Sequence, residues 1–107
     1  MKEPQRVPLS DALEAGSLAV GDAWVERVRD DLRSENRPTA GGWPGTLREA
    51  RARTYAHFTN EAGMRRYGAL SADALEVLVR AVYERARNQW LACAQMDDDK
   101  LEDEGDA

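Results

Sequence analysis

The sequence predicts an all-α protein, a small bundle of three to four helices organised on a long C-terminal helix at about residues 72–95. Apolar residues recur at helical spacing in several segments, and no segment alternates apolar and polar residues as a half-buried strand does. No internal repeat is visible, and the length of 107 residues fits one domain.

The segment from Ser71 to Gln95 has the clearest helical pattern. Its apolar side chains recur at steps of three or four residues, with one adjacent pair, so they share one helix face. This apolar stripe consists of Leu75, Leu78, Val79, Val82, Ala86, Trp90 and Cys93. Ser71 is suited to cap the helix, and Asp73 places a negative charge in the first turn, where the helix dipole favours it. The stripe needs cover from the rest of the chain or from another molecule.

Charge divides the chain into a nearly neutral body and an acidic tail. Residues 97–107 hold seven acids and one base, a local charge of −6, whereas the whole chain has a formal charge of −5. High charge density with few apolar residues is typical of disordered segments. The sequence therefore predicts an extended segment at 1–9, a single helical domain at 10–96 and a disordered acidic tail at 97–107.

Two helical segments are expected in the N-terminal part of the domain. Ser10 is suited to cap one short turn that Gly16 ends, because glycine is common just beyond a helix C-terminus. A longer helix is predicted at 23–35, with Asp22 as its cap. Asn36, in the left-handed conformation, is expected to end this helix.

The longest connection in the domain comprises residues 34–46. Irregular loops of about 12–15 residues are uncommon unless they are functional or disordered. Pro44 and Gly45 are suited to a type II turn, in which glycine supplies the positive φ. Thr46 and Glu49 then have the spacing of a capping box, which starts a helix.

The helix that starts there is predicted at 47–59. Thr59 and Asn60 favour caps over helix interiors, so a short second helix at 61–67 is expected to follow. One continuous helix at 47–67 is the alternative that the sequence leaves open.

Trp43 is the first candidate for an interaction residue. It stands in a loop beside glycines, where a large aromatic side chain either packs into the domain's own core or is presented to a partner. Inward packing is the commoner outcome, although tryptophan is enriched among binding hot spots. If Trp43 contacts a partner, Trp43→Ala should weaken binding and keep the helix content. If Trp43 is structural, the same change should unfold the domain.

Arginines concentrate in the middle of the chain. Six of them lie between Arg37 and Arg66, with only Glu49 and Glu61 as acids, which gives a local charge of +4. The candidate contacts in this arginine-rich segment, residues 48–66, are Arg48, Arg51, Tyr55, Arg65 and Arg66. Such arginines most often form a solvated face, yet they also occur in protein interfaces and in nucleic-acid-binding proteins.

No catalytic or metal-binding pattern is recognisable. His57 is the only histidine, and Glu61, one turn on, is its only neighbour at ligand spacing, too few for a metal site. The glycines of the loop lack the Lys-Ser/Thr pair of a phosphate-binding loop. We therefore expect no catalytic residue, no metal and no cofactor, and enzymatic activity ranks behind both binding functions.

The sequence favours a small protein-interaction module with the Trp43 loop as candidate contact and with self-association through the apolar stripe as one version. The alternative is a nucleic-acid-binding or regulatory protein that uses the arginine-rich segment as a helix-turn-helix, with the acidic tail as competitor for the ligand. The first residues do not form a signal peptide, and no apolar run approaches the length of a membrane span. We therefore expect an intracellular, cytoplasmic protein without a membrane partner.

Overall fold

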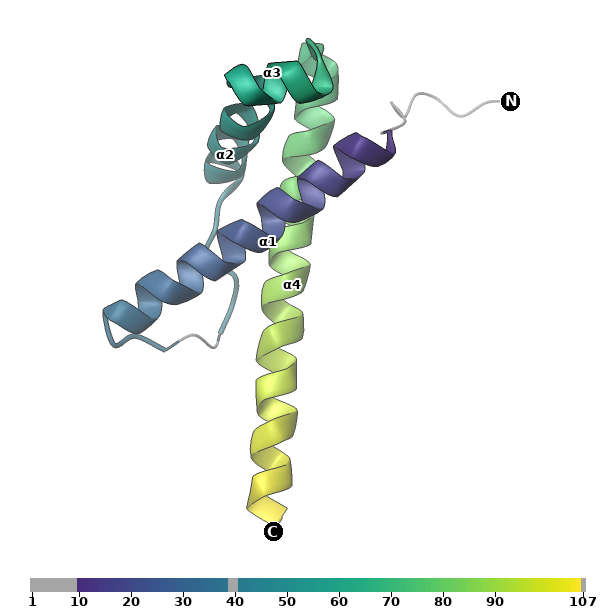
Figure 1. Cartoon of the computed structure of the whole chain (residues 1–107). Coiled ribbons are helices and arrows are strands. Elements are labelled where there is room, and N and C mark those ends of the chain that lie inside the picture. Colours follow the sequence, from purple (N-terminus) through teal and green to yellow (C-terminus); the bar gives the residue numbers. More distant parts are fainter. Residues whose placement is uncertain (1–9, 39–40, 107) are drawn as a thin grey trace.

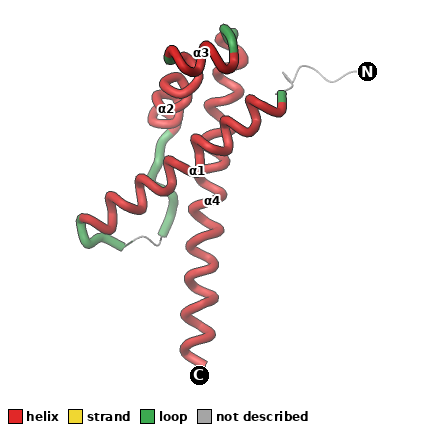
Figure 2. Tube along the Cα trace, viewed as in Figure 1, coloured by secondary structure: helices red, strands yellow, loops and turns green. Residues whose placement is uncertain are grey.

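The computed structural model describes residues 10–38 and 41–106, with side chains described as far as Cys93. These residues form four helices and no strand, which confirms the predicted all-α class (Figure 2). The helices are α1 (Asp11–Ser34), α2 (Leu47–Thr59), α3 (Glu61–Tyr67) and α4 (Ala72–Asp106). In Figure 1, α1 crosses the long α4 obliquely, while α2 and α3 lie towards the N-terminal end of α4. The predicted segment at 1–9 lies outside the described residues.

The apolar stripe of α4 forms the core of the domain. Its first six residues, from Leu75 to Trp90, are at most 7% exposed, and Cys93 is half-buried. Trp24 and Val25 from α1 and Phe58 from α2 pack against it. Burying a side chain of this size contributes roughly 1.5–3 kcal/mol. Because helices of the same chain cover the apolar stripe, the stripe offers no exposed face for self-association.

The N-terminal part of the domain is one helix, and the prediction of two segments is wrong. α1 runs for 24 residues through both Gly16 and Asp22. A Cβ atom at Gly16 would meet the Tyr67 hydroxyl at 2.7 Å, and one at Gly21 would meet the Arg85 Cγ at 2.7 Å. Both glycines therefore permit close approach of neighbouring helices, and this packing offsets their cost in helix propensity, about 1 kcal/mol each.

The predicted local signals at Ser10, Asn36, Thr46 and Ser71 are confirmed. The side chains of Ser10 and Ser71 accept hydrogen bonds from the backbone N–H groups three residues further on, at 3.2 and 3.1 Å. Asn36 adopts a left-handed φ of 58° after α1. Thr46 and Glu49 form the predicted capping box at the start of α2.

A sharp corner separates α2 from α3, so the alternative of one continuous helix at 47–67 is wrong. Asn60 ends α2 and caps α3, and its side-chain oxygen accepts a hydrogen bond from the Gly63 N–H at 2.7 Å. Gly63 is buried, and a Cβ atom there would collide with the backbone carbonyl groups of His57 and Phe58. The corner therefore requires glycine at this position.

The loop between α1 and α2 does not contain the predicted type II turn. Gly45 is not among the described glycines with positive φ, which are Gly41 and Gly68. A Cβ atom at Gly45 would lie 2.6 Å from the Trp24 ring and would also meet the ring of Trp43. Gly45 therefore makes room for two indole rings instead of supplying a turn conformation.

The long C-terminal helix ends later than predicted. α4 spans 35 residues and continues to Asp106, beyond the expected end near residue 95. Neither proline nor glycine occurs between Ala72 and Glu104, so no residue of this stretch breaks the helix. Figure 1 shows this part of α4 running past α1 and away from α2 and α3. The division of the chain at residue 96 into domain and tail stays a prediction.

Candidate partner-binding groove

Trp43 packs inward in a cluster with two other tryptophans. Its ring centroid lies 4.9 Å from that of Trp24 in an edge-to-face arrangement and 5.4 Å from that of Trp90. The Trp90 indole N–H donates a hydrogen bond to the carbonyl oxygen of Gly41 at 2.8 Å. This tryptophan cluster (Trp24, Trp43 and Trp90) pins the long loop against α1 and α4. The inward packing of Trp43 agrees with the alternative in which this residue is structural. A contact role for Trp43 stays a prediction.

Arg51 and Tyr55 face α4 and fasten α2 to it. The Arg51 guanidinium donates two hydrogen bonds to the Glu76 carboxylate, at 2.7 and 3.1 Å, and the Tyr55 hydroxyl donates a third at 3.1 Å. The hydrogen bond from Arg51 is the main reason why the pKa of Glu76 lies below its ordinary value. The hydrogen bond to Glu76 likewise raises the pKa of Tyr55. Arg51 and Tyr55, both predicted as partner contacts, therefore bind another helix of the same chain.

The other predicted arginines lie apart from this pair. Arg48 is exposed in the first turn of α2. On α3, Arg65 forms an ion pair with Glu61 at 3.1 Å, and the guanidinium of Arg66 lies 5.7 Å from the centre of the Tyr67 ring. The six residues predicted as contacts therefore do not converge on one site.

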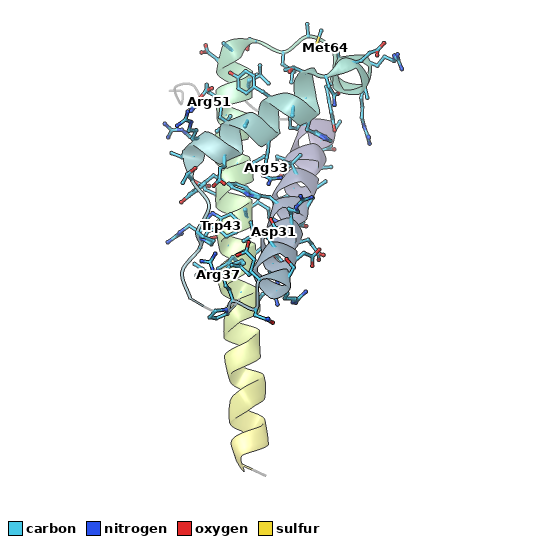
Figure 3. All side chains as sticks on the ribbon, turned by 90° about the vertical axis from the view of Figure 1, so that its left-hand side faces the viewer. Asp31, Arg37, Trp43, Arg51, Arg53 and Met64 are labelled. Atoms are coloured by element: carbon cyan, nitrogen blue, oxygen red, sulfur yellow. The ribbon has the colours of Figure 1, made fainter. Side chains whose placement is uncertain are left out.

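The structure brings together a set of residues that the sequence pattern does not single out. A groove of about 500 Å³ lies between α1 and α2, both of which pack mainly on α4. Its lining residues are Ala19, Val20 and Ala23 of α1 and Arg53, Ala56, His57 and Asn60 on the α2 side. Figure 3 shows Arg51 and Arg53 on α2, of which Arg51 is bound to α4 and Arg53 belongs to this α1–α2 groove.

The groove combines exposed alanines of both helices with donor groups along its α2 side. The guanidinium of Arg53 lies 5.5 Å from the centre of the Trp24 ring, so it reaches from α2 to α1. The Nε2 atom of His57 lies 3.1 Å from the Tyr67 hydroxyl oxygen. Burial, and secondly the charge of Arg66, lower the pKa of His57 and so favour its neutral imidazole.

A second hollow, of about 350 Å³, lies between α1 and α4. It is lined by Asp22, Val25, Glu26, Arg29, Arg33, Gln89 and Cys93. Asp22 accepts hydrogen bonds from Arg85 at 2.8 and 3.1 Å, so it is part of the α1–α4 packing. Charged residues of both signs line this hollow, and it lacks the alanines that line the α1–α2 groove.

Comparison with protein-family models, with curated proteins and with solved structures found no match for this chain. Within the described residues, no group of three or more His, Cys, Asp or Glu side chains is placed to hold a metal ion. In the same part of the chain, no helix combines the length and the apolar character needed to cross a bilayer.

His57 should make the stability of the domain depend on pH. Its pKa in the folded protein lies below the ordinary value of 6.5, so the unfolded chain binds the proton more readily. The contribution of the neutral His57 to the stability of the folded domain is therefore fully present above pH 6.5. It is lost as the pH falls through 6.5 towards the pKa that His57 has in the folded protein. Urea unfolding between about pH 7.5 and about pH 5 should show a smaller loss of stability for His57→Gln than for the native chain. Equal losses for the two proteins would contradict this.

Proposed function

We propose that the protein is a small protein-interaction module whose α1–α2 groove receives a helix of a partner protein. The observation that carries the proposal is the small apolar lining of the groove by the exposed alanines Ala19, Ala23 and Ala56, next to polar residues of the α2 side. Small side chains let an incoming helix approach at the short end of the usual interaxial range, about 8–10 Å. An apolar centre with a polar rim is the usual anatomy of a protein interface.

A helix is the form of partner that this groove suits best. Both walls of the groove are helices, and an amphipathic helix laid in such a groove is a common recognition mode. Strand addition needs an exposed sheet edge, and the described part of the chain contains no strand. The candidate contact thus moves from the Trp43 loop, which packs inward, to the α1–α2 groove. A cytoplasmic location stays part of the proposal.

Nucleic-acid binding receives less support. The second helix of a helix-turn-helix enters the major groove, whereas α3 has only seven residues and packs against α2 through the buried Gly63. The acidic residues 97–106 continue α4 away from α2 and α3, so the tail does not lie over the arginine-rich segment (Figure 1). The hypothesis of a competing tail therefore has no support from this arrangement.

Selection of peptides against the purified protein tests the proposal. A displayed library of amphipathic helical peptides should yield binders, and Ala23→Gln or Ala56→Gln should weaken them at least about tenfold by filling the groove. Ala92→Gln on the exposed side of α4 is the matched control and should leave affinity unchanged. All three substitutions are at exposed alanines and introduce a good helix former, so circular dichroism should show unchanged helix content. Failure to select any binder, or equal affinity for all variants, would refute the proposal.

A further inference from the structure

We infer that the partner helix is acidic, with its carboxylates against Arg53 and Arg66 and its apolar face on the alanines that line the α1–α2 groove. This inference rests on the proposed function and specifies the chemistry of the partner. It is carried by the distribution of charge along the α2 edge of the groove.

Arg53 supplies the first cationic contact. It is only half-exposed, and the Trp24 ring lies against its guanidinium at 5.5 Å. A guanidinium that stacks on an aromatic ring keeps its in-plane N–H donors for a carboxylate, which it binds in a forked geometry. The ring also restricts the motion of the side chain, so less conformational entropy is lost when a ligand binds.

Arg66 of α3 supplies the second contact, beyond the C-terminal end of α2. A small hollow of about 90 Å³ beside α3 is lined by Arg66 and Tyr67 and shares His57 and Asn60 with the α1–α2 groove. The groove therefore continues past the end of α2 to Arg66. Arg53 and Asn60 are seven residues apart, which corresponds to roughly 10 Å along a helix. Carboxylates two turns apart on a partner helix would therefore reach from Arg53 to the Asn60 end of the groove, beside the small hollow that Arg66 lines.

Nothing in the groove balances these charges. No acidic residue lines either the α1–α2 groove or the small hollow beside α3. Among the described residues, Arg53 and Arg66 contact aromatic rings and form no ion pair with a carboxylate. By contrast, Arg51 and Arg65 of the same helices are each paired with a glutamate. Charge complementarity of this kind selects partners and accelerates association.

A pair of designed peptides tests the inference. Both are helical with an alanine and leucine face, and one carries Glu at two positions seven residues apart where the other carries Gln. Fluorescence anisotropy at low salt, about 50 mM, should show about five- to tenfold tighter binding of the Glu peptide. This preference should shrink at about 300 mM salt and disappear in the Arg53→Gln/Arg66→Gln variant. Arg87 is an exposed arginine of α4, so Arg87→Gln is the matched control. This variant should retain the preference for the Glu peptide.

The outcomes separate the inference from the proposed function. If both peptides bind equally and Ala56→Gln weakens both, the acidic partner is refuted and the interaction module stands. If neither peptide binds, and library selection also yields no binder, both fail. If a fluorescent DNA duplex binds more tightly than the Glu peptide, and this binding needs Arg53 and Arg66, the inference is overturned in favour of nucleic acid.

Discussion

Trp24→Ala should lower the free energy of unfolding by about 3–5 kcal/mol, the usual cost of removing a buried tryptophan side chain. Trp24 is 1% exposed and contacts the rings of Trp43 and Tyr83, with centroid distances of 4.9 and 6.5 Å. Its removal leaves a cavity where α1, α4 and the long loop meet. Since native proteins have a total stability of about 5–15 kcal/mol, this loss is a large fraction of the total.

Urea unfolding followed by circular dichroism measures this loss. Leu18→Ala is a suitable control on the same helix, because Leu18 is 40% exposed. It should cost less than about 1 kcal/mol, as is usual for surface substitutions. A similarly small loss for Trp24→Ala would mean that α1 is not packed on α4 as described.

Trp43→Ala should cost about 2–3 kcal/mol, less than the fully buried Trp24 because Trp43 is only half-buried. The change removes the contacts of Trp43 with both other tryptophans and leaves the loop held by the hydrogen bond between Trp90 and Gly41. Trp43→Phe should cost less than Trp43→Ala, because a phenyl ring keeps part of the aromatic packing.

The Trp43→Ala variant decides whether Trp43 is a structural residue or a contact residue. Trp43 does not line the α1–α2 groove, so folded Trp43→Ala protein should bind a groove peptide with unchanged affinity. Thermal unfolding and peptide titration of one preparation measure both effects. Full stability together with lost peptide binding would restore Trp43 as the contact residue.

Helix ends could be predicted from the sequence because their determinants are local. Ser10, Asn36, Thr46, Asn60 and Ser71 each act within a few residues of their own position, and all five behave as expected. The long C-terminal helix could be predicted for a related reason. Its periodic apolar face needs no knowledge of which elements cover it.

The glycines and some charged residues were misjudged because their roles depend on distant parts of the chain. Gly16 interrupts a helix by propensity alone, but in the fold it faces Phe58 and Tyr67. Asp22 has the chemistry of a cap, yet it binds Arg85, 63 residues further on. Glu76 binds Arg51, which lies 25 residues away on another helix. None of these partners can be identified from periodicity.

The α1–α2 groove could not be predicted for the same reason. Arg53, Ala56, His57 and Asn60 lie at spacings of three, one and three residues, which places them on one helix face. Ala19 and Ala23 have the complementary spacing of one turn, but they form a helix face only if α1 is continuous through Gly21. Because a helix break is predicted near Asp22, the sequence does not place Ala19 and Ala23 on one helix face.

Isotope-labelled protein titrated with the acidic peptide tests the central claim most directly. The claim is that the α1–α2 groove is the binding site, so amide chemical shifts in NMR spectra should change most at Ala19, Ala23, Ala56 and His57. The amides of Leu91 and Ala92, on the exposed side of α4, should stay unchanged. Changes confined to α4, with none at the four groove residues, would contradict it.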